Sequence, residues 1–115
     1  MNDKINYIYV MVRIDLPIHD QIVQACHACY ESAINYGKND TYLVLLQAKD
    51  QNELVECSKI CNNHDIQHHM FYEPDHAEEI GEFPMGFTAI CAEPLYGKRR
   101  ELFKDCELWS QNNSR

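Results

Sequence analysis

The run INYIYVMVRI at residues 5–14 decides the fold of this 115-residue chain. Nearly every position is β-branched, aliphatic or aromatic, which is typical of a strand buried on both faces of a sheet. The tripeptide DLP at residues 15–17 ends the run, and Asp20 is the predicted N-cap of a helix that follows. The helix is expected to end near Tyr36, with Gly37 as its C-cap.

The apolar residues of this first helix recur at helical spacing, so we expect them to face the core. They are Ile22, Val23, Cys26, Tyr30, Ala33 and Ile34.

The rest of the chain continues the alternation of strand and helix. TYLVLLQ at residues 41–47 predicts a second buried strand, and Asp50 is expected to cap a helix over residues 51–63. Its predicted apolar stripe is Leu54, Val55, Ser58, Ile60 and Cys61. Residues 66–72 and 87–92 predict two more strands, joined by an acidic loop and therefore antiparallel. Residues 101–109 predict a final helix, which residues 95–100 could open.

The order β-α-β-α-β-β-α predicts an α/β fold in one domain spanning residues 1–115. We expect a three-layer sandwich, in which a mixed, largely parallel four-stranded sheet has helices on both faces. Active sites in such sheets gather at the carboxyl ends of the strands. Residues 15–24, the turn at residues 72–75 and Thr88 are therefore predicted to converge.

Composition narrows the function classes. The formal net charge of -8 disfavours a large nucleic-acid footprint, which needs basic side chains, and Lys98, Arg99 and Arg100 form the single local basic patch. The chain has no apolar run long enough for a membrane span and no apolar signal sequence, which favours a cytoplasmic protein. Its six cysteines are expected to be reduced, with Cys26, Cys57, Cys61 and Cys91 acting as small core residues.

Two ordered groups of residues resemble the type 2 peptidyl-tRNA hydrolases, in a divergent form found in bacteria and phages. The first is VMVRIDL at residues 10–16, followed by QACHA at residues 24–28. The second is FYEPD at residues 71–75, followed by TAI at residues 88–90. The resemblance extends over about residues 7–103. No single motif is specific to the family, but the order in which the motifs follow one another is moderately specific.

The resemblance implies hydrolysis of the ester that joins a peptide, or an N-blocked amino acid, to the 3′ end of tRNA, without a cofactor. Such chemistry needs a positioned water, a base and donors for the oxyanion. By position, Asp75 would be the acidic group of the site and Thr88 would hold water or substrate. Gln24 and His27 would line the pocket. The neighbouring residues Asp15, Tyr72 and Glu73 are further candidate ligand-binding residues.

The chain departs from the family at two places. The family carries a catalytic lysine among glycines before the first helix, whereas residues 17–21 here read PIHDQ. His19 could replace that lysine or be an ordinary surface histidine. Glu79 stands where the family often has a threonine, and nearby carboxylates would repel tRNA. An alternative is therefore an inactive relative that binds a nucleotide or small ligand in the same cleft.

Two other interpretations start from single features. Cys26, Cys29 and the histidines are metal-type ligands, but they lack the paired spacing of structural zinc sites, so no metal is predicted. Exposed Tyr or Phe side chains, or Trp109, could supply the interface of a homodimer.

Overall fold

The computed structural model describes residues 5–37, 41–74 and 85–110. Its elements in chain order are β1 (Asn6–Arg13), α1 (Ile18–Tyr36), β2 (Thr41–Ala48), α2 (Gln51–Asn63), β3 (His68–Glu73), β4 (Gly86–Ala92) and the 3-10 helix η3 (Gly97–Phe103). The strands lie within two residues of their predicted bounds, and α2 has the predicted bounds.

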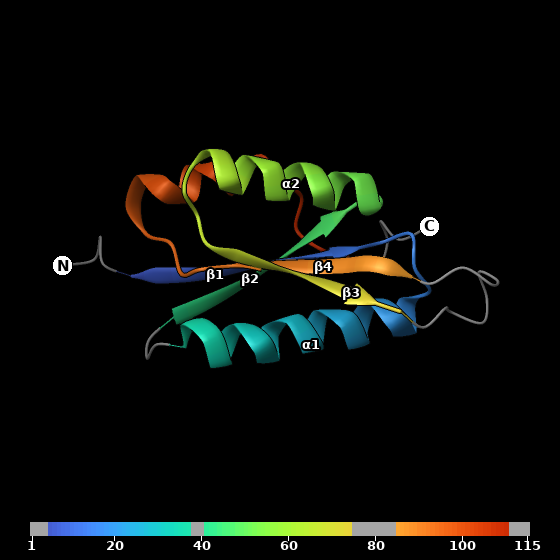
Figure 1. Cartoon of the computed structure of the whole chain (residues 1–115). Coiled ribbons are helices and arrows are strands. Elements are labelled where there is room, and N and C mark those ends of the chain that lie inside the picture. Colours follow the sequence, from blue (N-terminus) through green and yellow to red (C-terminus); the bar gives the residue numbers. More distant parts are fainter. Residues whose placement is uncertain (1–4, 38–40, 75–84, 111–115) are drawn as a thin grey trace.

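The four strands form one mixed sheet in the order β2-β1-β4-β3 (Figure 1). Strand β1 is parallel to β2 and antiparallel to β4, and β4 is antiparallel to β3. Strands β1, β2 and β3 therefore run in one direction, and β4 runs against them. This arrangement confirms the predicted α/β class, the mixed sheet and the antiparallel final pair.

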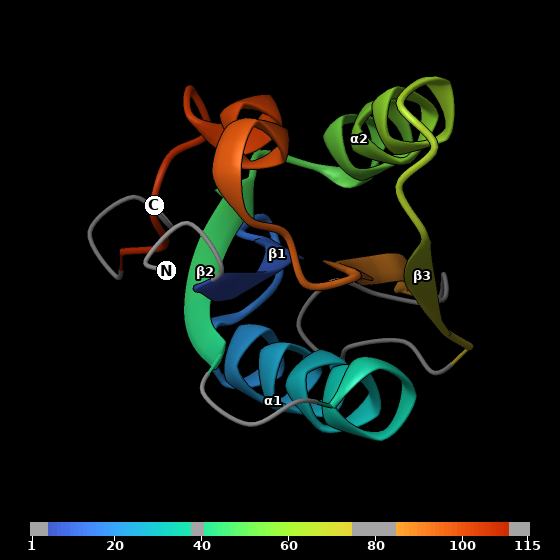
Figure 2. The ribbon, with the colours of Figure 1, turned by 90° about the vertical axis from the view of Figure 1, so that its left-hand side faces the viewer.

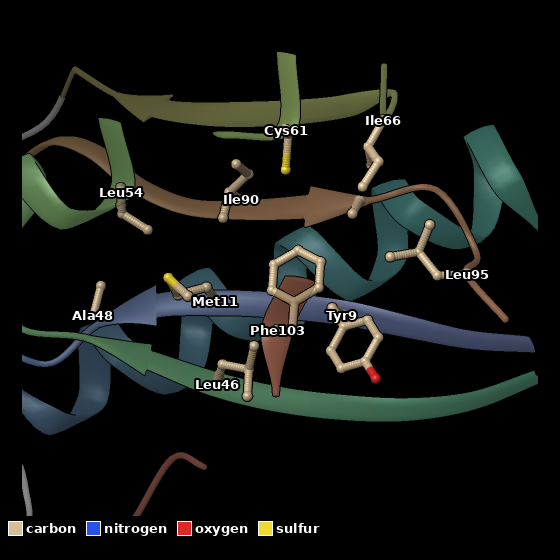
Figure 3. Close-up of a cluster of buried hydrophobic side chains, with 11 residues drawn as sticks. Tyr9, Met11, Leu46, Ala48, Leu54, Cys61, Ile66, Ile90, Leu95 and Phe103 are labelled. Carbon is tan, nitrogen blue, oxygen red and sulfur yellow. The ribbon is translucent and has the colours of Figure 1, made fainter. Parts of the chain in front are cut away.

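Helices cover both faces of the sheet, as predicted. Helix α1 lies on one face, and α2 and η3 lie on the other (Figures 1 and 2). Strand β1 supplies both cores because its side chains alternate between the faces. Val10 and Val12 pack with Ala25 and Ala28 of α1, whereas Tyr9 and Met11 belong to the α2 side. The α2-side cluster is shown in Figure 3.

The second predicted strand is only partly buried. Strand β2 lies at the edge of the sheet, and its first half exposes Tyr42 and Leu43. The predicted burial is therefore wrong for residues 42 and 43. An apolar run does not distinguish a buried central strand from an apolar edge strand.

The orientation predicted for α1 is wrong. The helix buries Gln21, Gln24, Ala25, Ala28 and Ser32 against the sheet. Its predicted apolar stripe faces solvent instead, with Ile22, Val23, Cys26, Tyr30, Ala33 and Ile34 all exposed. The small side chains of Ala25 and Ala28 let the helix pack close to the sheet, so this side is buried and the apolar stripe is not. Cys26 is accordingly not a core residue, although Cys61 and Cys91 are fully buried.

Two helix ends also differ from expectation. Helix α1 begins at Ile18, so Pro17 rather than Asp20 occupies the N-cap position, without a side-chain cap. Asp20 instead lies in the first turn, where the positive end of the helix dipole stabilises its negative charge. The final helix is the 3-10 segment η3 at Gly97–Phe103, and it ends well before Trp109. In contrast, Asp50 caps α2 as predicted, accepting a hydrogen bond of 3.0 Å from the backbone N–H of Glu53.

Candidate functional site

The carboxyl end of β1 is tied to the start of β4 through Arg13. Its guanidinium donates Nε to Asp15 Oδ1 at 2.8 Å and Nη2 to Asp15 Oδ2 at 2.9 Å. Nη1 donates to the carbonyl oxygens of Met85 and Phe87. The guanidinium is almost entirely buried, so its donors serve the protein rather than a ligand. Asp15, a candidate ligand-binding residue, is the partner that neutralises this charge.

Gln24 and Thr88, two of the residues selected from the sequence, meet across the α1–β4 contact. The Thr88 hydroxyl donates to Gln24 Oε1 at 2.7 Å, although the two residues are 64 positions apart. Thr88 has no exposed surface, and Gln24 is 7% exposed. A hydroxyl that is buried and already bonded in this way is not presented to solvent, where it would have to hold a reacting water.

A row of four aromatic rings borders this polar pair on the α1 side of the sheet. The ring of His27 lies 5.6 Å from that of Phe71, between centroids. Phe71 lies 6.4 Å from His69, and His69 lies 5.8 Å from Tyr36. The Phe71 carbonyl is 3.4 Å from the Thr88 hydroxyl, which places the ring row directly beside the buried pair.

The ring row is partly open to solvent and has carboxylates beside it. The side chain of His27 is 53% exposed, and its Nε2 lies 3.9 Å from a Glu31 carboxylate oxygen. His69 is exposed as well. At the far end of the row, burial, assisted by nearby Cys91 and Glu93, raises the pKa of Tyr36 above its usual value. Carboxylates thus lie near both ends of the row, Glu31 at His27 and Glu93 at Tyr36.

His19, Tyr72 and Glu73 complete the selected residues that the structure describes. His19 is exposed in the first turn of α1, not in a turn before the helix as expected. Tyr72 is 56% exposed, and its ring meets the edge of Phe87 at 5.3 Å between centroids. Glu73 ends β3 and is half-buried. Asp75 lies outside the described residues.

One important residue of this region carried no signal in the sequence. Gln21 is 1% exposed, and its Nε2 donates to the carbonyl oxygens of Ile14 and Leu16. Its Oε1 accepts from Trp109 Nε1 at 2.8 Å. Gln21 thereby joins the β1–α1 turn to the C-terminal segment. It also places Trp109 at the α1-side core rather than at a free surface.

The basic patch of the sequence is far from these residues along β1. Arg100 lies 3.5 Å above the centre of the Tyr7 ring, and its Nε donates to the Tyr9 hydroxyl at 2.9 Å. Tyr7 and Tyr9 belong to the first half of β1, whereas Arg13 and Asp15 lie at its other end. Arg99 is bound to the Asp65 carbonyl and to Glu93. The patch therefore supplies no cation to the carboxyl end of the sheet.

A separate cleft of about 460 Å³ opens on the α2 side of the sheet. Its apolar wall includes Met11, Ile60 and Phe103. Four carboxylate side chains and a single lysine also line it, namely Glu53, Glu56, Asp105, Glu107 and Lys49. None of the residues selected from the sequence lines this cleft, and its charge disfavours a phosphate-bearing ligand.

The six cysteines, all within the described residues, are free thiols. Burial raises the pKa of Cys91 to about 11, so this thiol is protonated at neutral pH. A hydrogen bond with Cys61, together with burial, raises the pKa of Cys57, while the same bond lowers the pKa of Cys61. Over residues 5–37, 41–74 and 85–110, no three His, Cys, Asp or Glu side chains are grouped to hold a metal ion. No helix in these ranges could cross a membrane.

The fold defines the chain as a small α/β protein with a four-stranded mixed sheet between helical layers. No protein-family profile matches its sequence. No curated protein is significantly similar to it. Among solved structures, it is similar to a protein of unknown function, Atu0240, from Agrobacterium tumefaciens strain C58. The two share 14% sequence identity with a TM-score of 0.69, over 96% of this chain and 100% of the other. At this identity the likeness concerns the fold alone.

Proposed function

We propose that this domain is a relative of the type 2 peptidyl-tRNA hydrolases that binds a nucleoside-like ligand without hydrolysing an ester. The observation that carries the proposal is the Thr88 hydroxyl, which is fully buried and donates to Gln24 Oε1. A catalytic role would need this hydroxyl to face a water or substrate. The absence of the family's lysine from residues 17–21 argues in the same direction.

The ligand chemistry follows from the ring row of His27, Phe71, His69 and Tyr36. Flat, partly exposed rings favour an aromatic ligand. A nucleobase can stack on such rings whichever base it is, because every base has a flat aromatic face. Glu31, whose carboxylate lies beside His27, disfavours phosphate at that end of the row. Arg13, the cation at the end of β1, is already neutralised by Asp15. A neutral nucleoside therefore fits better than a nucleotide.

Thermal unfolding in the presence of nucleosides and nucleotides tests this proposal. Ligand that binds only the native state raises the midpoint of unfolding. We expect adenosine to raise it, AMP to raise it less, and His27→Ala to abolish the rise. His64→Ala serves as the matched control, because His64 is an exposed histidine at the end of α2. An unchanged midpoint with every nucleoside would contradict the proposal.

Ester hydrolysis is the second candidate, and one observation favours it. Gln24 and Thr88, which the resemblance assigns to the hydrolase site, do lie in contact. The purified protein would be incubated with N-acetyl-aminoacyl-tRNA while release of tRNA is followed, with Asp75→Ala as the control. Our proposal predicts equal release by both proteins. Faster release by the unaltered protein would establish the hydrolase instead.

A further inference from the structure

Helix α1 presents a continuous apolar surface to solvent. Ile22, Cys26, Tyr30 and Ile34 follow one another at intervals of four residues and therefore form one ridge of the helix. Ile22 is 53% exposed, Tyr30 67% and Ile34 61%. Val23 and Ala33 lie beside the ridge and are also exposed. We call these six residues the α1 ridge, which extends over about 18 Å of helix.

The α1 ridge is more apolar than the solvent-exposed side of a helix usually is. The polar residues Gln21, Gln24 and Ser32 are buried against the sheet, while the larger apolar side chains of the same helix face outward. Contiguous exposed apolar patches of more than a few hundred Å² mark interaction sites in soluble proteins. Leu43 extends the apolar surface on the same side of the sheet, because its register partner Ile8 packs against α1.

We propose that the α1 ridge is the interface of a two-fold symmetric homodimer, in which α1 packs antiparallel to α1 of a second copy. The ridge is self-complementary about a centre at residue 28. In this arrangement Ile22 faces Ile34 of the other copy, and Val23 faces Ala33. Cys26, which is small, faces Tyr30, which is large, on both sides of the axis. Nearly aligned helices pack at crossing angles of about 20°, with the ridges of one helix in the grooves of the other.

Charge favours a second copy over other partners. Between residues 21 and 34 the only acidic or basic side chains are His27 and Glu31, which pair with one another and are not part of the ridge. The ridge is thus a place where two chains of net charge -8 can approach without opposing carboxylates. Antiparallel packing also sets the N-terminus of each helix beside the C-terminus of the other, which aligns the helix dipoles favourably. A membrane surface fits poorly, because α1 carries no Lys or Arg.

The size of the α1 ridge determines how tightly the proposed dimer is expected to associate. A standard interface buries about 800 Å² per partner, whereas the largest apolar patch of a typical monomer covers about 300–600 Å². The ridge and Leu43 are seven residues, against about 20–30 residues a side in a standard interface, so we expect a dimer that dissociates on dilution rather than an obligate one. The test of the dimer measures the oligomeric state and needs no ligand, so it can fail or succeed independently of the proposed function.

Sedimentation velocity over a dilution series tests the dimer. We expect a concentration-dependent shift from dimer to monomer. Tyr30→Glu should raise the dissociation constant about 30-fold or more, because it places a charge at the centre of the interface. Tyr30→Ser provides a milder variant should the charged one unfold. Ile60→Glu is the matched control, since Ile60 is a 43% exposed side chain of α2 on the opposite face of the sheet. A monomer at every concentration, or a dimer that is lost only in Ile60→Glu, would overturn the proposal.

Cross-linking tests the antiparallel arrangement. In Tyr30→Cys, residue 30 of one copy faces Cys26 of the other, so mild oxidation should yield a covalent dimer. Adding Cys26→Ser should remove that product. The variant Ile34→Cys is the positional control, because residue 34 faces Ile22, which has no thiol. Equal cross-linking in both single variants, or a Cys26–Cys26 disulfide in the unaltered protein, would rule out the antiparallel pair.

Discussion

At the scale of single residues, Gln21 is the clearest example of a role that the sequence does not reveal. A glutamine four residues after Pro17 has no pattern to distinguish it from a solvated residue. Its role arises only because the β1–α1 turn leaves the Ile14 and Leu16 carbonyls facing it and because Trp109 returns from the chain's other end. By contrast, the Gln24–Thr88 contact agrees with the convergence at the strand ends that was expected from residue order.

Replacing Gln21 by leucine should destabilise the protein by about 1–3 kcal/mol, because buried polar partners lose their hydrogen bonds. Unfolding in urea, followed by circular dichroism, measures the loss. The fluorescence of Trp109, the single tryptophan, should change in the native state as well. Gln67→Leu alters an exposed glutamine and should have little effect. Equal stability of the Gln21 and Gln67 variants would show that the buried network is unimportant.

The buried thiol of Cys91 predicts a loss of stability at alkaline pH. In the native state burial holds the pKa of Cys91 at about 11, whereas the usual value for an exposed thiol is 9.0. Between these values the unfolded chain binds fewer protons than the native one, so rising pH favours unfolding. Urea unfolding at pH 8 and pH 10.5 should therefore show a fall in stability that is smaller in Cys91→Ala. The same fall in both proteins would assign it to other groups.

At the scale of elements, the positions of helices and strands were predictable, but the orientation of α1 was not. Periodicity indicated where the helix lies, and we assumed that its apolar side faces the core. Ala25 and Ala28 are small enough to pack against β1 and β4, and this side includes polar residues with internal partners. An apolar pattern in the sequence does not tell whether that side of the helix faces the core or, as we propose, a second copy of the chain.

The stability contributed by Asp50 at the start of α2 can be compared directly with that of Asp20 at the start of α1. Asp50→Ala should lower the stability by about 0.5–2 kcal/mol, because the Asp50 carboxylate caps the Glu53 N–H. Asp20→Ala should cost less, since Asp20 lies inside the first turn of α1 and is not its N-cap. Urea unfolding of both variants under the same conditions provides the measurement. A larger loss for Asp20→Ala would restore the capping role expected from the sequence.

At the scale of the whole molecule, strand order in the sequence predicted the class and layers of the fold. It could not place β2 at an edge or set β4 between β1 and β3, because pairing depends on contacts between distant segments. The approach of Gln24 to Thr88 was predictable from residue order, and the site roles of these residues and of His27 stay predictions. The burial of Thr88 and the ring row arise from packing between α1, β3 and β4, and no local pattern encodes such packing.

The central claim is that the ring row on the α1 side of the sheet binds a nucleoside. The most direct measurement is a titration of isotope-labelled protein with adenosine, followed by two-dimensional NMR. We predict progressive shifts at His27, His69 and Phe71, with none at the α2-side cleft residues Cys57 and Cys106. No shift at millimolar adenosine, or shifts confined to the α2-side cleft, would contradict the account.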